Sequence, residues 1–277
     1  MKDKKASAAI YVFLDPGHER KCLQHQAEIL YSFTRRLFAN AGISEGMRVL
    51  DVGSGAGDVA FLAAELSGPG GSVVGIDTNP SVLETARHRA EDLGYSNISF
   101  LAGDIRSLDL KGSFDAVVGR QVLLYLKDPA EAIRSAIRNL NSGGIVAFLE
   151  IDLSNGFVCI PPSPLLEKMR GWLFETWKRA RVEMQMGLKL RKTFMTAGLT
   201  EPNMQCDAII GGGNSWEGYK HAADTIRSML PVMTTLGVTT ADEVDIDTLE
   251  VRFRREIADT DGVAMLSTWI GAWSRKS

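Results

Sequence analysis

Glycines and carboxylates share one short stretch of this sequence, VLDVGSGAGDVA. Gly53, Gly55 and Gly57 stand at alternate positions after an apolar run, and Asp51 and Asp58 flank them. A glycine turn between a strand and a helix lets the backbone approach a ligand closely, because no Cβ stands in the way. The pattern therefore predicts a site for a nucleotide-like ligand.

The spacing of the glycines excludes two common phosphate sites. The dinucleotide fingerprint reads G-x-G-x-x-G, but counting from Gly53 its third glycine position falls on Asp58. No Gly-Lys-Ser/Thr follows, so the turn is not a phosphate-binding P-loop. Two carboxylates would repel a pyrophosphate, whereas they would suit a ligand that carries an ammonium and a sulfonium group.

Apolar runs predict the strands that must position this turn. The central runs are rich in Val, Ile, Leu and Phe, as expected of buried parallel strands. Helical patterns separate them, and three helices start with a capping residue followed by proline, at Asn79, Asp128 and Ser163. The alternation predicts an α/β fold with a doubly wound, mostly parallel, seven-stranded Rossmann-like sheet. The predicted strands are Met47–Val52, Ser72–Asp77, Asn97–Ala102, Phe114–Gly119, Gly144–Glu150, Asn203–Ile210 and Met265–Trp273.

Two regions do not follow the alternation. Residues 1–45 are predicted to form an N-terminal helical cap, and residues 211–262 carry two further helical patterns between the sixth and seventh strands. The core then consists of residues 46–210 and 263–277. The helices of 211–262 either pack on the core, as apolar stripes usually do, or form a lid over a substrate pocket.

Several segments in chain order resemble the class I S-adenosylmethionine-dependent methyltransferases, in their small-molecule, UbiE-like branch. The glycine stretch is similar to their first motif, and VVGID ends in Asp77, as their second strand ends in an acidic residue. AGDIRSL, FDAVVGRQVLLYLKDP, LNSGGIVAFLEID and TWIGAWSRK are similar to the later strands and their loops. The resemblance is close over residues 46–151 and looser elsewhere, and it implies S-adenosylmethionine as cofactor.

The resemblance also implies roles for single residues. Asp77 would hold the ribose hydroxyls, Asp104 would meet the adenine amino group and Ile105 its ring. Each also has a structural interpretation, since Asp77 precedes the cap Asn79, and Asp before a short helix is a common cap. The other cofactor contacts implied are Tyr11, Gln26, Asp51, Gly53, Ser54, Gly55, Thr78, Gly103, Arg120 and Gln121.

Arg120 follows the fourth strand, where a guanidinium would hold the methionine carboxylate or an anionic substrate. The alternative is a surface ion pair. The loop after it reads GRQVLLY, which differs from the Asn/Asp-Pro-Pro-Tyr segment of enzymes that methylate exocyclic amines. The acidic residues of metal-dependent catechol-type enzymes and the Arg-Asn-Val segment of quinone methyltransferases are also missing. No metal is expected.

A general base is needed only where the nucleophile starts protonated. His88 lies among charged residues of an exposed helix face and is expected to be solvated. His25 shares a helix face with a second histidine seven residues earlier. The candidate catalytic residues are Tyr125, Asp152, His18 and His221, of which the first two follow predicted strands at the edge where ligands bind.

The composition of the chain limits the classes of partner that it is expected to bind. The formal charge is −3 and Lys and Arg are scattered, which argues against nucleic acid. No run reaches the ~18 apolar residues of a membrane span, and the N-terminal apolar run lacks a cleavage site, so a cytoplasmic location is expected. Three cysteines far apart predict reduced thiols and no zinc site.

The sequence thus predicts metal-independent methyl transfer to an O, N or C nucleophile of a small organic acceptor, with secondary metabolism as one setting. A protein or peptide methyltransferase is the alternative enzyme, and a noncatalytic cofactor-binding module is the alternative from another class. The sequence leaves homo-oligomerisation and the identity of the acceptor open.

Overall fold

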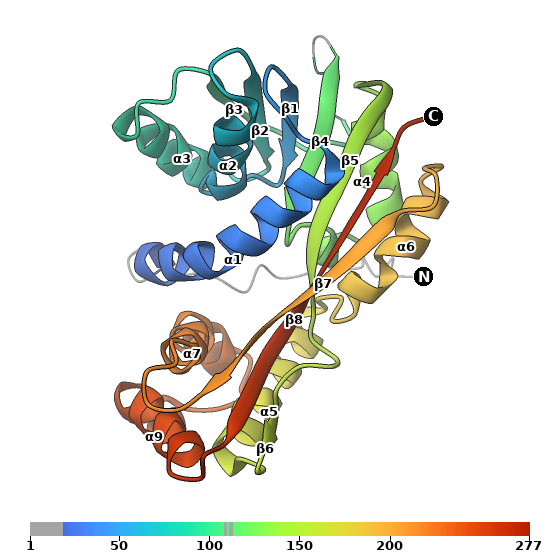
Figure 1. Cartoon of the computed structure of the whole chain (residues 1–277). Coiled ribbons are helices and arrows are strands. Elements are labelled where there is room, and N and C mark those ends of the chain that lie inside the picture. The colour runs from blue at the N-terminus through green and yellow to red at the C-terminus, as the bar shows by residue number, and fades with distance from the viewer. Residues whose placement is uncertain (1–18, 108–109, 111–112) are drawn as a thin grey trace, which may run out of the picture. The chain divides into compact units, whose positions relative to one another are not determined.

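The computed structural model describes residues 19–107, 110 and 113–277, with side chains from Leu30 onward (Figure 1). The helices are α1 (Glu19–Ala41), α2 (Asp58–Ser67), α3 (Pro80–Asp92), the 3-10 helix η1 (Leu123–Tyr125), α4 (Pro129–Ile137), α5 (Pro164–Ala180), α6 (Met186–Thr196), α7 (Gly218–Thr235), α8 (Ala241–Val244) and α9 (Ile246–Ala258). The strands are β1 (Arg48–Val52), β2 (Ser72–Asp77), β3 (Ile98–Ala102), β4 (Phe114–Arg120), β5 (Leu140–Asp152), β6 (Val158–Ile160), β7 (Asn203–Gly212) and β8 (Val263–Arg275).

The described strands form one sheet in the order β3-β2-β1-β4-β5-β8-β6, with β7 paired to β8. The neighbouring strands within the group β1 to β5 all pair in parallel, and β6 is antiparallel to β8. This confirms the predicted doubly wound, mostly parallel α/β sheet. The predicted count of seven strands was wrong, because the sheet has eight among the described residues. The missed strand, β6, has three residues, which is too short to stand out as an apolar run.

The predicted helix starts are confirmed. The Asn79 side chain accepts a hydrogen bond from the Ser81 amide at 3.0 Å. The carboxylate of Asp128 and the hydroxyl of Ser163 accept from the amide three residues on, at 2.9 and 3.0 Å. Proline follows each cap, where its missing N–H costs nothing and its fixed φ favours the helix.

Two compact units are built from separate stretches of chain. One consists of Ile151–Gln185, Asp207–Thr268 and the described residues before Leu30. The other consists of Leu30–Glu150, Met186–Cys206 and Trp269–Ser277, and it contains the glycine turn. We call them the first and the second unit. Residues 211–262, the predicted lid, lie entirely in the first unit.

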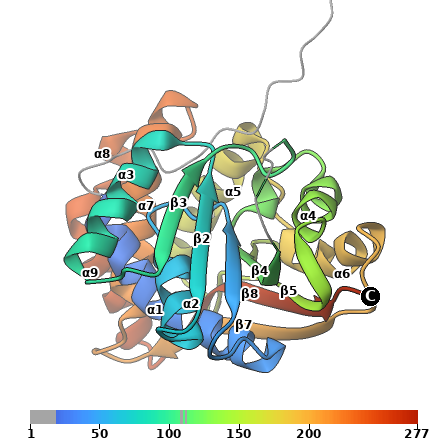
Figure 2. The same ribbon diagram turned by 90° about the horizontal axis from the view of Figure 1, so that it is seen from above.

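The second unit holds the sheet strands β1 to β4 and the helices that follow them. Helices α2 and α3 pack on β1, β2 and β3, and α4 packs on α6 (Figure 2). The central strands are buried because their side chains are apolar on both faces, as parallel strands require. Fully buried side chains in this unit include Leu37, Phe38, Val49, Leu50, Leu83, Val117 and Phe148.

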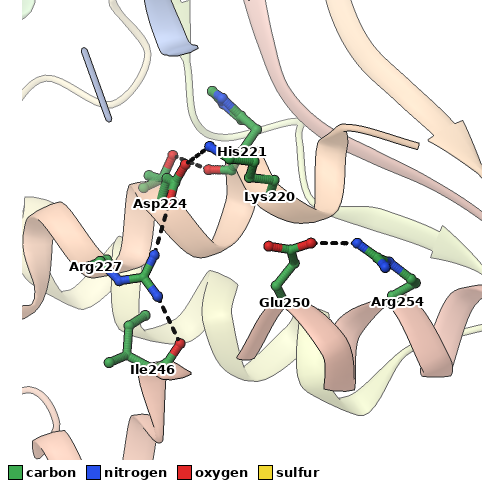
Figure 3. A network of polar contacts seen from close by, with 8 residues as sticks. Lys220, His221, Asp224, Arg227, Ile246, Glu250 and Arg254 are labelled. Atoms are coloured by element: carbon green, nitrogen blue, oxygen red, sulfur yellow. Dashed lines mark hydrogen bonds and ion pairs between the residues drawn. The ribbon is translucent and has the colours of Figure 1, made fainter. Parts of the chain in front are cut away.

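In the first unit, α7 and α9 are held together by aromatic and polar contacts. The rings of Tyr219 and Phe253 meet edge to face, with centroids 5.4 Å apart. Asp224 pairs with Lys220 and Arg227 at 2.6 and 2.9 Å, and Arg227 also donates to the Ile246 carbonyl oxygen at 3.4 Å, at the start of α9 (Figure 3). The apolar and charged residues of this segment recur at helical spacing because one helix packs on the other through them.

Candidate active site

The glycine turn joins β1 to α2 and is tied to the end of β2. The amides of Gly53 and Ser54 both donate to the Ile76 carbonyl oxygen, at 2.8 and 2.9 Å. Gly53 has φ of +69°, and a Cβ there would lie 2.5 Å from Cγ2 of Val122. Gly55 has φ of +51°, and a Cβ there would meet no atom within 4 Å. Gly53 is therefore required by packing, whereas Gly55 borders open space at the turn.

Asp77, the last residue of β2, connects the turn to the next helix. Its Oδ2 accepts from the Gly55 amide at 3.0 Å and its Oδ1 from the Asn79 amide at 2.9 Å. Its backbone oxygen accepts from the Gly103 amide at 2.9 Å, which brings the loop after β3 to the same edge. Thr78 is exposed beside it. The structure thus gathers the loops after β1, β2 and β3 around Asp77, as expected at the carboxyl edge of a parallel sheet.

Asp104 follows β3 and pairs with a near neighbour. Nε of Arg106 donates to its two carboxylate oxygens at 2.9 and 3.0 Å, and the Arg106 amide donates to Oδ1 at 2.9 Å. These side-chain hydrogen bonds hold the pKa of Asp104 below its usual range. Ile105 is buried. The adenine contacts assigned to both residues stay a prediction.

Two ionisable side chains at the ends of neighbouring strands are largely covered: Asp51 in β1 is fully buried, and Arg120 at the end of β4 is 11% exposed. Neither carboxylate oxygen of Asp51 has a hydrogen-bond partner among the described residues. Burial raises the pKa of Asp51 to about 8, and the Arg120 charge opposes that rise. Nη1 of Arg120 donates to the Thr34 hydroxyl at 3.2 Å, and its Nη2 lies 3.9 Å from Oδ2 of Asp58. Arg120 thus forms an ion pair with Asp58 in which both side chains are mostly covered, and its assigned contact with the cofactor stays a prediction. The Ser54 hydroxyl is also buried without a partner in the described part of the chain.

Glu150, near the end of β5, was missed by the sequence prediction. Its fully buried carboxylate accepts from the amides of Val122, Leu123 and Leu124, at 3.0, 2.8 and 3.4 Å. Burial raises its pKa to about 7, although these amides lower it. Gln121, just before them, has a φ of +53°. A glutamate inside the apolar run IVAFLEI was the available signal, because an acidic side chain in a buried strand needs a partner.

The Asp51 carboxylate makes unfolding depend on pH in a predictable direction. Its pKa is about 8 in the folded chain against an ordinary 3.8, so the folded chain binds the proton more tightly. The stabilisation is present below pH ~4 and is lost as pH rises toward ~8, by up to ~1.4 kcal/mol per pH unit. Asp51→Asn should therefore flatten the fall in unfolding free energy between pH ~5 and ~8.5, measured by urea denaturation.

Asp128→Asn is the control for this measurement, since it removes a carboxylate that caps α4. Other groups, including Glu150, contribute to the slope of the wild type, so the difference between variants is the informative quantity. Equal slopes for the wild type and Asp51→Asn would contradict the raised pKa assigned to the buried Asp51 carboxyl.

The remaining candidates belong to different parts of the chain. Asp152 and His221 are buried in the first unit. Tyr125 ends η1 in the second unit. Gln26 lies on α1, whose side chains are described only from Leu30, and Tyr11 and His18 lie outside the described residues.

Within the described residues, no three His, Cys, Asp or Glu side chains form a group that could hold a metal ion. None of the described helices is long and apolar enough to cross a membrane. The features that remain at the turn are an open backbone edge, several carboxylates and two buried polar groups without partners among the described residues. Those features fit a small ligand that carries a cationic group and hydroxyl donors.

A family model described as "Methyltransferase domain" matches residues 43–198, which is more than half of the chain. The chain belongs to this methyltransferase family. The match spans the glycine turn, Asp77, Asp104, Arg120 and Glu150. The resemblance stated above is thereby confirmed, and so is the predicted class, a methyltransferase domain that uses S-adenosylmethionine, at the level of the family.

Curated relatives of this methyltransferase domain act on different molecules. Aklanonic acid methyltransferase DauC of Streptomyces sp. is 36% identical over 149 residues, covering 52% of this chain and 68% of that protein. A ubiquinone/menaquinone biosynthesis C-methyltransferase UbiE of Pseudomonas paraeruginosa is 37% identical over 46% of this chain and 48% of that protein. For an arsenite methyltransferase of Aquipseudomonas alcaligenes, the identity is 37% over 39% of this chain.

The chain spans a third of the length of that arsenite methyltransferase, at 33%, and about half of UbiE. Among solved structures, YcgJ of Bacillus subtilis has a TM-score of 0.56 and 18% identity, and the match covers 89% of this chain and 100% of that chain. At this identity the likeness shows the fold of the methyltransferase domain and nothing finer.

Proposed function

We propose that this chain transfers the methyl group of S-adenosylmethionine to an O, N or C atom of a small organic acceptor, without a metal ion. Bound S-adenosylmethionine supplies a methyl group on a sulfonium, whose sulfur leaves with the bonding electron pair as a nucleophile attacks the carbon. The observation that carries the proposal is the turn itself, in which Gly55 borders open space and its amide is bonded to Asp77.

The charges around the turn support this cofactor. Asp58 and Asp77 both act on Asp51, and each raises the pKa of its carboxyl. This acidity favours a cationic ligand over a phosphate. A ligand ammonium beside Asp51 would favour the ionised carboxylate and would oppose the rise in pKa that burial causes. Asp77 keeps lone pairs for the ribose hydroxyls beside its two backbone bonds.

The relatives support a small acceptor. The names of the three relatives above refer to arsenite, aklanonic acid and ubiquinone/menaquinone biosynthesis. Small acceptors are therefore favoured over the alternative of a protein or peptide. A setting in secondary metabolism and a cytoplasmic location stay predictions.

Asp152 is the residue we assign to the acceptor. Its Oδ1 accepts from the Ser154 amide, the Ser154 hydroxyl and the Asn155 side-chain amide, at 3.2, 2.7 and 3.1 Å. Its Oδ2 is buried and has no partner among the described residues. A carboxylate that is fixed through one oxygen and has no protein partner at the other is suited to accept a hydrogen bond or proton from the hydroxyl or amine of an acceptor that reaches it.

The segment 211–262 is proposed as a lid for that acceptor. Three large side chains of this segment, Tyr219, Met229 and Met233, are fully buried in the first unit. They therefore contribute to packing of the segment, and contacts with an acceptor would come from its exposed residues.

The test first compares the binding of two ligands and then measures methyl transfer. S-Adenosylhomocysteine, the demethylated product, should raise the melting temperature and NAD should not; at about a hundred times Kd the stabilisation is ~2.7 kcal/mol. Incubation with methyl-labelled cofactor and a cell extract should then place label in small molecules. Label in protein would favour the peptide alternative, and binding without transfer would favour the noncatalytic module. Stabilisation by NAD alone would overturn the proposal.

A further inference from the structure

Glu150 has more backbone partners than a buried carboxylate needs for burial alone. It is the one acidic residue in a stretch of β5 whose neighbours Phe148, Leu149 and Ile151 are apolar and buried. Its two oxygens accept from the consecutive amides of Val122, Leu123 and Leu124. These amides belong to the segment that runs from β4 into η1, so a single side chain fixes three successive residues.

A strained residue directly precedes the segment held by Glu150. Gln121 has a φ of +53°, in the left-handed region that a side chain with a Cβ disfavours. Its amide donates to the Leu149 carbonyl oxygen at 3.0 Å, so its position relative to β5 is fixed. Such a conformation persists only when surrounding contacts impose it, and the Glu150 carboxylate supplies contacts directly after it.

The same segment touches the glycine turn. Cγ2 of Val122 lies 2.5 Å, and its Cβ 2.9 Å, from the position that a Cβ on Gly53 would take. Val122 therefore packs directly on the turn whose next residues include Gly55. A continuous set of contacts runs from Glu150 through the amide of Val122 to the backbone of Gly53.

We propose that Glu150 is a positioning residue for cofactor binding. Its carboxylate holds residues 121–124 in the conformation in which Val122 supports the glycine turn, and this sets the affinity of the turn for S-adenosylmethionine. The inference rests on the proposed function for the identity of the ligand. The support of the glycine turn by Glu150 through Val122 concerns contacts within the chain and does not depend on that function. A buried glutamate with a purely structural role would change stability without changing affinity in the folded protein.

The experiment compares the wild type, Glu150→Gln, Gln121→Gly, and the double variant that carries both substitutions. Glutamine keeps the size of the side chain but replaces one accepting oxygen by a donor that faces backbone N–H groups. We expect S-adenosylhomocysteine to bind about tenfold more weakly by titration calorimetry. Backbone amides 122–124 and the Gly53 amide should exchange hydrogen faster. Glycine at 121 adopts the left-handed conformation without strain, so Glu150→Gln should cost only about threefold in affinity when the double variant is compared with Gln121→Gly. That comparison cancels any contact that the Gln121 side chain makes with the cofactor.

Asp115→Asn is the matched control. Its carboxylate also accepts from a backbone amide, that of Arg48 at 2.9 Å, but near the opposite end of β4. It should leave affinity and exchange at the turn unchanged. Unchanged affinity in a folded Glu150→Gln variant with faster exchange at 122–124 would overturn the proposal, and so would unchanged exchange.

Two further results are decisive. If Glu150→Gln does not fold, recovery of folding in the double variant supports the role assigned to Gln121, and failure to recover contradicts it. If the wild type binds no S-adenosylhomocysteine, the proposed function fails. In that case faster exchange of the Gly53 amide in Glu150→Gln still supports the link between Glu150 and the turn, and normal exchange refutes it.

Discussion

Gly55→Ala is expected to weaken S-adenosylhomocysteine binding about a hundredfold while the chain stays folded. The new Cβ would meet no protein atom within 4 Å, so it would project into the space that borders the turn. A ligand seated against the backbone there would have to move away from the amide that Asp77 holds. Overpacking of this kind costs ~1–3 kcal/mol, and the lost backbone approach adds to it. Titration calorimetry measures the change directly.

Gly94→Ala is the control for backbone strain at Gly55. Gly94 also has a positive φ, +76°, and a Cβ added there would likewise meet no atom within 4 Å, but this glycine follows α3. Alanine in the left-handed region costs ~1–2 kcal/mol at either position, so both variants should lose similar stability. Only Gly55→Ala should lose affinity. Equal affinity in the two variants would mean that the ligand does not approach the turn at this residue.

Asp77→Ala should weaken S-adenosylhomocysteine binding by roughly ten- to a hundredfold. The carboxylate organises the amides of Gly55 and Asn79, and we assign the ribose hydroxyls to its remaining lone pairs. Hydrogen bonds to a charged group contribute ~1.5–3 kcal/mol each, which corresponds to that range. Because the variant also loses the contact within the chain, circular dichroism and the melting temperature must accompany the calorimetry.

Asp77→Asn separates the two roles of this side chain. It keeps one accepting oxygen for a backbone amide but removes the charge and places an NH₂ group toward the other partner. Asp128→Asn, at the cap of α4, controls for the loss of a carboxylate that accepts from a backbone amide. Wild-type affinity in folded Asp77→Ala would reduce Asp77 to a residue that starts α3.

The strands β1 to β4 were predicted to within one residue at each end, because each is a short apolar run between turn residues. β5 extends from Leu140 to Asp152, well beyond the predicted Gly144–Glu150, and β6 was missed. The ends of β5 are polar or glycine-rich, so hydrophobic pattern does not mark them. β6 exists through its pairing with β8, in which Val158 lies opposite Met265, and such a distant partner leaves no local signal.

The sequence predicted those site residues that lie in the loops after consecutive strands. Gly55, Asp77 and the Gly103 amide meet at one edge because parallel strands bring their carboxyl ends together. Partners from distant segments were not predicted. The hydroxyl that receives Arg120 belongs to Thr34, and the carboxylate that holds residues 122–124 belongs to β5. Which group forms a hydrogen bond with a buried ionisable side chain is a property of the tertiary structure.

The division into two interleaved units has a consequence for synthesis and for engineering. The chain passes from one unit to the other after Ile29, Glu150, Gln185, Cys206 and Thr268. The stretch Trp269–Ser277 belongs to the second unit and brings the fully buried Trp269. On the ribosome, the unit that holds the glycine turn is therefore incomplete until this stretch has been translated. A fragment cut at the family boundary, residue 198, would lack that closing stretch and would expose core surface that invites aggregation.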